Sequence, residues 1–300
     1  MSEAAASTYL ERLAARSAAT GTVLCLGVDP DPAALPAGFS ADIKGVERFA
    51  ELLLEAALPF AAAVKPNLAF FEAFGAAGWA ALERTRARIP ADVPVIADAK
   101  RADIDSTTAR QVVAYFDALG VDAVTVSPYL GQDAVAAYLE RPDRFAYVLC
   151  RTSNEGAADL QGLRVRGRWE EDGGFSAPDE PLWARVARDV AGWGPGGTAG
   201  LVVGATAPDE LRAARAIAPG LAFLVPGVGA QGGSIAPVLE HGPATEAPAG
   251  GRRGGGLLVN VSRGIAGAAI GNGAAGPAID LAERLAEAAR GWSQKLPVLR

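Results

Sequence analysis

Hydrophobic residues along the chain gather in eight short runs, and longer segments with helical spacing lie between them. The runs cover residues 22–28, 60–65, 94–99, 122–127, 145–150, 200–205, 222–227 and 257–262. Each run is apolar almost throughout, which is typical of parallel strands that are buried on both faces. Apolar residues recur at helical spacing in residues 45–57, 76–89, 106–119, 131–140, 181–193, 208–217 and 278–292.

Eight strands that alternate with helices predict an α/β fold, a (β/α)8 TIM barrel, with residues 1–300 as a single domain. An open doubly wound sheet is the alternative, and it is disfavoured because no GxGxxG motif follows the first run. The N-terminal segment predicts a first amphipathic helix.

Two insertions interrupt the alternation of strands and helices. The segment near 155–180 is charged and rich in glycine, and the segment 241–256 has low complexity. We expect the second to be a mobile surface loop in which Arg252 and Arg253 are solvated.

The composition limits the classes of partner. The chain has 300 residues, of which half are hydrophobic, and its net charge is -6. An acidic balance argues against a nucleic acid as partner, because phosphate backbones attract basic surfaces, so an anionic ligand must be held by local groups. No apolar run approaches the roughly 18 residues of a membrane span, and the N-terminus lacks a signal pattern. We therefore expect no membrane association and a cytoplasmic location.

The cysteines and the histidine narrow the chemistry further. Cys25 and Cys150 lie inside apolar runs and are expected to be buried core residues. The single histidine, His241, is expected in a loop rich in glycine and proline. One histidine excludes a histidine-based zinc cluster and disfavours a Ser-His-Asp triad. We therefore expect the catalytic and binding groups to be carboxylates, lysines, arginines and backbone groups.

Polar residues follow seven of the eight runs. Since ligands of a barrel bind at the C-terminal ends of its strands, and since charges within apolar strands are unfavourable unless they are paired or used, these residues predict a site. A stabilising ion pair is the alternative for any one pair of them. The residues are Asp29, Lys65, Asn67, Asp98, Lys100, Asp103, Ser127, Arg151, Thr152, Ser153, Asn154, Gln231 and Arg263.

Two groups within this set have a specific chemistry. Asp98 and Lys100 are two residues apart on a predicted strand, so their side chains point the same way, and Lys65 ends the neighbouring strand. Such alternating charges keep one another ionised. The glycine-rich turn at 226–233 can offer backbone N–H groups to a phosphate, and Arg263 supplies a fixed guanidinium.

These residues resemble the orotidine 5′-monophosphate decarboxylase family, in its longer bacterial branch. The matching segments are GVDP (27–30), VKPN (64–67), DAKRADIDST (98–107), RTSNEGA (151–157), PGVGAQGG (226–233) and SRGI (262–265), and they extend over nearly the whole chain. The resemblance implies decarboxylation of orotidine 5′-monophosphate to uridine 5′-monophosphate (UMP) and CO2 in de novo pyrimidine synthesis. It also implies that no metal or cofactor is used.

The resemblance assigns the centre of the chemistry to four residues. Lys100 resembles the lysine that protonates C6 of the pyrimidine as CO2 leaves. Asp98 resembles the carboxylate set against that of the substrate, and Lys65 the lysine that orients Asp98 and touches the ribose. Asp29 resembles the carboxylate that binds a ribose hydroxyl.

Five further residues acquire roles from the resemblance, which also implies a homodimer with shared active sites. Asp103, the remaining catalytic residue, and Thr107 resemble residues that reach into the site of the neighbouring subunit. Ser153 resembles the serine that contacts the pyrimidine amide. Gln231 and Arg263 resemble the phosphate ligands.

Three alternative functions remain. Hexulose-phosphate synthases, which share the D-x-K-x-x-D pattern, use magnesium and aldol chemistry, but they have a carboxylate where this chain has Lys65. A Schiff-base aldolase would need a neutral Lys65 or Lys100, which neighbouring acids disfavour. A nucleotide-binding or regulatory relic would not call for two carboxylates beside an anion.

Overall fold

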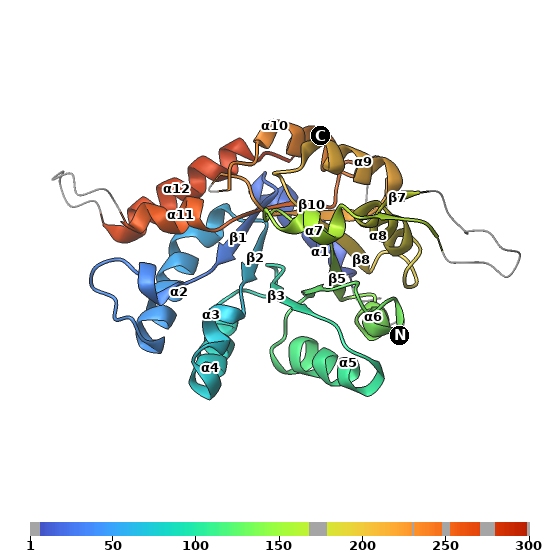
Figure 1. Ribbon diagram of the computed structural model, residues 1–300. Helices are drawn as coiled ribbons and strands as arrows, with labels where there is room; N and C mark the ends of the chain where they lie inside the picture. Colours follow the sequence, from blue (N-terminus) through green and yellow to red (C-terminus); the bar gives the residue numbers. More distant parts are fainter. Residues whose placement is uncertain (1–6, 168–178, 230, 248–252, 271–279, 299–300) are drawn as a thin grey trace, which may run out of the picture.

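The strands of the barrel surround a common axis, with the helices outside them (Figure 1). The computed structural model describes residues 7–167, 179–229, 231–247, 253–270 and 280–298. Eight parallel strands form one sheet in the order β2-β1-β10-β9-β8-β5-β4-β3. They are β1 (Leu24–Val28), β2 (Ala63–Pro66), β3 (Ile96–Arg101), β4 (Ala123–Val126), β5 (Phe145–Arg151), β8 (Ala199–Val203), β9 (Ala222–Val225) and β10 (Leu257–Val261).

The two strands at the ends of this order, β2 and β3, also meet. Val64 is bridged to Val95 and Asn67 to Asp98, and the N–H of Val64 donates to the carbonyl of Pro94 at 3.0 Å. The sheet is therefore a nearly closed barrel, not an open doubly wound sheet, and each of the eight predicted runs overlaps one of its strands.

The predicted helical segments form helices, with two differences in their extent, and four short helices were not predicted: Ala69–Glu72, Ala157–Gln161, Ile235–His241 and Arg263–Ala266. Segment 106–119 divides into α5 and a π-helical turn at Val113–Ala118, and residues 278–279 of the last segment lie outside the described residues. The helices are α1 (Tyr9–Thr20), α2 (Ile43–Ala57), α3 (Ala69–Glu72), α4 (Gly75–Ala87), α5 (Asp105–Val112), α6 (Asp133–Leu139), α7 (Ala157–Gln161), α8 (Leu182–Ala191), α9 (Pro208–Ile217), α10 (Ile235–His241), α11 (Arg263–Ala266) and α12 (Leu281–Lys295).

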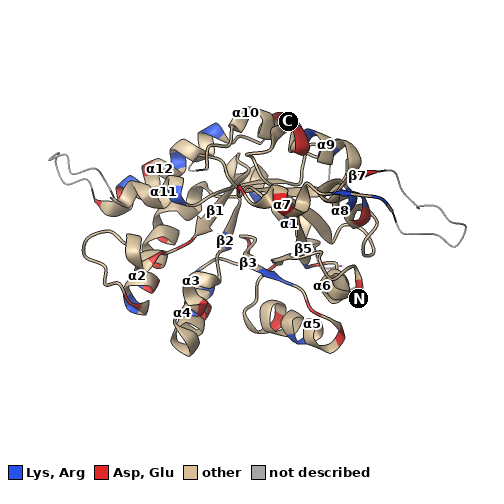
Figure 2. Ribbon diagram, in the orientation of Figure 1, with Lys and Arg blue, Asp and Glu red and all other residues tan. Residues whose placement is uncertain are grey.

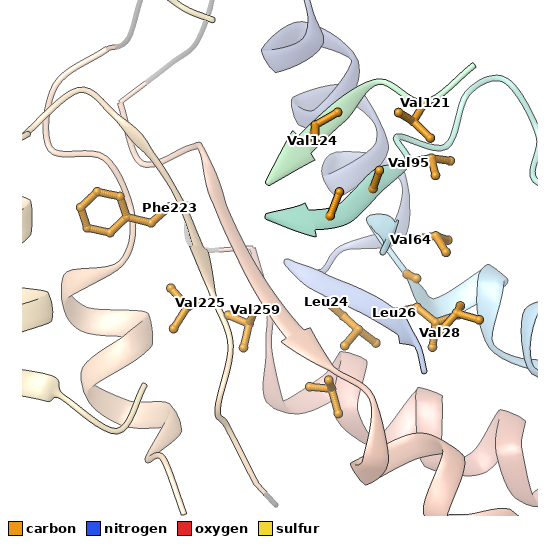
Figure 3. Close-up of a cluster of buried hydrophobic side chains, with 14 of the residues drawn as sticks. Leu24, Leu26, Val28, Val64, Val95, Val121, Val124, Phe223, Val225 and Val259 are labelled. Carbon is orange, nitrogen blue, oxygen red and sulfur yellow. The ribbon is translucent and has the colours of Figure 1, made fainter. Parts of the chain in front are cut away.

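Side chains along each strand alternate between two hydrophobic cores, as the period of two requires. Outward residues such as Leu24, Leu26 and Val28 pack under the surrounding helices, where Figure 3 shows them with the valines of neighbouring strands. Inward residues such as Cys25 and Phe145 fill the barrel itself. This alternation decides which polar residues nearer the ends of the strands face the barrel axis.

Helix α1 forms where the sequence predicts a first amphipathic helix, and it covers the N-terminal end of the barrel. Thr8 and Glu11 form a capping box at its start, and Tyr9 is fully buried in the interior core. The hydroxyls of Tyr9 and Tyr147 are 3.1 Å apart, and Arg12 donates to Asp122, just before β4, at 2.8 Å. The interior core and α1 together fill this end, so the polar cavity lies at the opposite end.

Both insertions are described only in part. In the first, α7 is followed by β6 (Arg164–Val165) and β7 (Glu180–Pro181), which pair antiparallel, and residues 168–178 lie outside the described residues. In the second, residues 248–252, including Arg252, also lie outside them, and Arg253 is exposed as predicted.

The cysteine prediction is confirmed, whereas the loop prediction for His241 is wrong. Cys25 and Cys150 are buried and free. His241 is the last residue of α10, because Ile235, Val238 and Leu239 recur at helical spacing and pack on the core before Gly242 and Pro243 end the helix. Within the described ranges, every helix is too short or too polar to cross a lipid bilayer.

Candidate active site

A cavity of about 520 Å³ opens where the strands end, on the side away from α1. Seven of the nine predicted site residues line it, from β1 to the turn after β10. These are Asp29, Lys65, Asp98, Lys100, Ser153, Gln231 and Arg263. Asp103 and Thr107 lie outside this lining, in the segment that leaves β3 and in α5.

Two ion pairs join three charged side chains of the cavity lining. Lys65 Nζ lies 2.5 Å from Asp98 Oδ2, and Lys100 Nζ lies 2.5 Å from Asp98 Oδ1. The Lys65 side chain is 5% exposed and that of Asp98 is 12% exposed, whereas Lys100 is 51% exposed. Lys65 and Asp98 are therefore fixed inside the barrel, whereas Lys100 lies half-exposed at the cavity.

The pKa values show that this pair stays charged. Burial alone would raise the pKa of Asp98, but the charges of Lys65 and Lys100 outweigh burial, so its pKa lies well below the usual value. Burial would likewise lower the pKa of Lys65, but Asp98 and Asp29 outweigh it, so its pKa is raised. The prediction that these groups hold one another ionised is confirmed for Lys65 and Asp98.

The backbone at Lys100 is not that of a regular strand. Its φ is 51°, and the register between β3 and β4 shifts between Ala97 and Arg101. Asp98 and Lys100 do lie together as predicted, but regular strand alternation is not the reason. A left-handed backbone is unfavourable for lysine, so the surrounding hydrogen bonds must hold it.

Thr125 on β4 supplies those hydrogen bonds, and sequence reasoning missed it. Its Oγ1 accepts from the N–H groups of Ala99 and Lys100 at 3.0 Å each, and it donates to Asp98 Oδ1 at 3.1 Å. Thr125 is almost fully buried. It shares the inward side of β4 with Ala123, so the period of two could have found it as a polar residue facing the axis.

At the ends of β1 and β10, three buried oxygen atoms have no hydrogen-bond partner among the described residues. They are Asp29 Oδ1, Asn260 Oδ1 and Ser262 Oγ, all in residues of the cavity lining. Buried polar atoms are normally paired, so a polar ligand would satisfy them. Asn260 and Ser262 were also not predicted, although Asn260 shares the inward side of β10 with Leu258 and Ser262 directly follows the strand.

The loops after β5 and β9 meet at Ser153 and Gln231. Ser153 Oγ donates to Gln231 Oε1 at 3.1 Å, and the Thr206 hydroxyl donates to the carbonyl of Ser153 at 3.1 Å. A Cβ on Gly227 would lie 2.9 Å from Ser153 Cβ, so this approach requires glycine there. This hydrogen bond therefore joins two predicted ligand-binding residues that come from separate loops.

The other polar residues of the predicted set are divided between this cavity and other parts of the molecule. Thr152 and Asn154 line the same cavity, whereas Ser127 lines a second cavity of about 360 Å³ beside α8. Arg151 pairs with Glu210 at 3.4 Å. Among the described residues, no group of three or more His, Cys, Asp and Glu side chains is placed to hold a metal ion.

Basic and acidic residues are interspersed on the helices outside the barrel, for example along α5 and α9 (Figure 2). Binding of an anion therefore depends on the cavity itself, where Lys100 and Arg263 stand beside Asp29 and Asp98. A (β/α)8 barrel with this charged cavity at the strand ends defines an enzyme that acts on a small anionic ligand.

Comparison with known proteins names the family. A family model described as orotidine 5'-phosphate decarboxylase / HUMPS family matches residues 22–278, and the chain belongs to this family. Orotidine 5'-phosphate decarboxylase of Herpetosiphon aurantiacus is 44% identical over 77% of this chain and 83% of its own. The enzyme of the same name from Thermomicrobium roseum is 41% identical over 96% of this chain and 93% of its own.

Solved structures agree with the family assignment. Leishmania donovani OMP decarboxylase superposes with a TM-score of 0.76 at 37% identity, over 96% of this chain and 97% of that one. A putative orotidine-monophosphate-decarboxylase from Toxoplasma gondii gives a TM-score of 0.80 at 35% identity, over 96% of this chain and 95% of that one.

Proposed function

We propose that the protein decarboxylates orotidine 5′-monophosphate to UMP and CO2 in pyrimidine synthesis. The family membership and the relatives of that name support this reaction. The observation that carries the mechanism is the exposed Lys100 ammonium, held 2.5 Å from a buried, ionised Asp98.

Lys100 is the proton donor in this mechanism. When the bond between C6 and the carboxylate breaks, CO2 leaves and the electron pair stays on C6, which has no adjacent carbonyl to spread the charge. A fixed ammonium stabilises this carbanion and then gives it a proton. The Lys100 side chain, anchored at one end by Asp98, suits both tasks.

Asp98 and Lys65 prepare the site for this step. A carboxylate held beside the substrate's own carboxylate raises the energy of the bound ground state, and that repulsion is released as CO2 departs. Lys65, almost fully buried, keeps Asp98 ionised and in place. The two lysines therefore differ in role: Lys65 holds Asp98 in place inside the barrel, and Lys100 faces the reacting carbon.

The remaining lining residues bind the nucleotide. Asp29, whose Oδ1 has no partner among the described residues, accepts a hydrogen bond from a ribose hydroxyl. Ser153 contacts the pyrimidine amide, and Gln231, bonded to Ser153, binds the phosphate together with Arg263. Phosphate contacts far from C6 help to close the loops over the substrate and so contribute to the rate.

The active form is a homodimer in this proposal, with Asp103 and Thr107 completing the partner's site. Both residues lie outside the cavity lining of their own barrel. Thr108 hydrogen-bonds to the backbone of Asp103, and Ile104 between them is 54% exposed. An ordered, exposed segment with an apolar side chain suits contact with a second subunit. We also propose a single domain over residues 1–300 and a cytoplasmic location.

A spectrophotometric assay with orotidine 5′-monophosphate tests this function. Conversion to UMP, undiminished in excess EDTA, is the expected result. A requirement for magnesium together with aldol activity on a sugar phosphate would instead place the chain with the hexulose-phosphate synthases. Borohydride trapping of a substrate on Lys65 or Lys100 would indicate Schiff-base chemistry and would contradict the proposed roles of both lysines.

A further inference from the structure

The indole of Trp292 lies between the turn after β9, which carries Gln231, and the single helical turn of α11, which carries Arg263. Trp292 belongs to α12, which runs alongside α11 (Figure 1). Its Nε1–H donates to the carbonyl of Gly264 at 3.0 Å, and Gly264 directly follows Arg263. Trp292 is not among the residues that line the cavity, so it contacts the walls of the site from behind.

Both turns have glycine where the indole approaches. A Cβ on Gly264 would lie 2.9 Å from both Nε1 and Cζ2 of Trp292, and a Cβ on Gly229 would lie 2.9 Å from Cη2. Real Cβ atoms do not come so close to other atoms, so any larger residue would push the indole and the turn apart. One ring is thus fitted against two segments that are more than thirty residues apart in the sequence.

The turn after β9 transmits the position of Gly229 to Gln231. The N–H of Gly232 donates to the carbonyl of Gly229 at 2.8 Å, and the N–H of Gly233 donates to that of Gly227 at 3.0 Å. These bonds close the turn on itself, with Gln231 inside it. A contact that fixes Gly229 therefore restricts where the Gln231 side chain stands.

The indole is itself held in place. Lys295, one turn later on α12, has its Nζ 5.1 Å from the centroid of the Trp292 ring, which is a favourable cation–π distance. The apolar side chains of α12 pack on the outer core, where Leu285 and Ala289 are fully buried. Trp292 is therefore held in a fixed position on a helix that packs against the outer core of the barrel.

We propose that Trp292 is a positioning residue that sets the separation of the two phosphate-binding turns. This inference rests on the proposed roles of Gln231 and Arg263. A clamp whose two sides already stand at the distance of a phosphate dianion loses less freedom on binding than a clamp that must first order its loops. Trp292 acts only through these turns and touches no part of the substrate.

The test compares two ligands that differ only in the phosphate. Trp292→Phe keeps an aromatic ring and removes the N–H donor. We expect its affinity for UMP to fall about three- to tenfold, as for loss of one hydrogen bond, while its affinity for uridine stays the same. Trp292→Ala should reduce the UMP-to-uridine affinity ratio further. Calorimetric titration or competitive inhibition measures both ligands.

Trp79→Phe is the matched control, because Trp79 also donates an indole hydrogen bond, to Glu83 at 3.1 Å, but on α4. It should leave the ratio unchanged. A purely structural role for Trp292 would lower both affinities or the thermal stability and leave the ratio intact, and that outcome would overturn the inference. If Trp292→Ala does not fold, Trp292→Phe decides.

Arg263→Ala separates this inference from the proposed function. If Arg263→Ala lowers the UMP-to-uridine ratio and Trp292→Phe does not, the phosphate site stands and the role of Trp292 is wrong. If Arg263→Ala leaves the ratio unchanged, the phosphate assignment fails and the inference with it. Where both single variants lower the ratio, we expect the double variant to fall short of the combined effect, because Trp292 acts partly through Arg263.

Discussion

Thr125 and Asp98 are joined by a hydrogen bond across two neighbouring strands, from the Thr125 hydroxyl to Asp98 Oδ1 at 3.1 Å. The same hydroxyl oxygen accepts the N–H of Lys100 at 3.0 Å. One buried side chain therefore sets the position of the carboxylate and holds the unusual backbone of the proposed proton donor.

Thr125→Val should lower kcat with little change in KM. Valine has the shape of threonine, so packing is preserved, but it can neither donate to Asp98 nor accept from Lys100. Loss of hydrogen bonds to a charged group predicts a fall of about 10- to 100-fold. Thr125→Ser, which keeps the hydroxyl, is the control and should stay near wild-type in a steady-state assay. Equal activity of both variants would contradict the positioning role.

Lys100→Ala should abolish CO2 release and leave UMP binding largely intact. Removal of a general acid lowers the rate by roughly 100- to 10,000-fold, whereas the nucleotide still has Asp29, Ser153 and Arg263. Substrate turnover is followed by absorbance, and UMP binding by calorimetry. Lys44→Ala, which removes an exposed lysine of α2, controls for loss of positive charge. Retained turnover would remove Lys100 from the proton-donor role.

Asp98→Asn should destabilise the fold, because it leaves the Lys65 charge buried without its main partner. Breaking a buried pair in this way lowers the free energy of unfolding by on the order of 3 kcal/mol. The double variant Lys65→Met, Asp98→Asn buries neither charge and should regain much of that loss. Urea unfolding at pH 7 measures all three proteins, and a double variant no more stable than the single one would contradict the explanation.

The same pair predicts the shape of stability against pH. The pKa of Asp98 is lowered, so its contribution is complete above about pH 4 and is lost as the pH falls further. The pKa of Lys65 is raised, so its contribution is complete below about pH 10 and is lost above it. In Asp98→Asn the carboxylate that outweighs burial is gone, so we expect burial to lower the pKa of Lys65 below its ordinary value, and the deficit in stability should shrink as the pH rises towards 10.

Arg263→Ala should reduce kcat/KM substantially, by roughly 10- to 100-fold for the loss of a charge-assisted contact with phosphate. Steady-state kinetics with orotidine 5′-monophosphate measure the change. Arg253→Ala removes an exposed arginine and should behave as wild-type, which controls for net charge. Near wild-type kinetics for Arg263→Ala would refute the phosphate assignment.

A mixed dimer tests whether the sites are shared. Lys100→Ala and Asp103→Ala chains are each expected to be inactive alone. When both are co-expressed and reassembled, one site of the mixed dimer receives an intact Lys100 from one chain and an intact Asp103 from the other, so activity should return. No recovery, in mixtures shown by tagged purification to contain mixed dimers, would count against the division of this segment between two sites.

The barrel and much of the site could be predicted from the sequence because their signals are local. Each strand is a continuous apolar run, and Lys65 and Asp98 end neighbouring strands, so their contact follows from strand order alone. The positive φ of Lys100 could not be predicted, because nothing in a lysine indicates a left-handed backbone. Thr125 and Asn260 could not be singled out as readily, because each is an uncharged residue within an apolar strand and its role depends on which side of the strand faces the axis.

Trp292 could not have been found from the sequence. Its contacts with Gly229 and Gly264 depend on how α12 packs against the barrel, and an aromatic residue on an amphipathic helix is ordinarily a core residue. The glycines give the only hint, since both stand in turns beside predicted ligands. That the indole requires glycine at both positions is clear only from its location in the structure.

The backbone of Lys100 also bears on how far this enzyme could be stabilised. A non-glycine residue at a φ of 51° lies about 1–2 kcal/mol above its relaxed state, and glycine would remove that penalty together with the ammonium. If Lys100 is the proton donor as proposed, selection for heat resistance would favour glycine at this position, whereas selection for turnover would reject it. Thermostable variants have to gain their stability elsewhere, in the helices and the outer core, and carry this local strain with them.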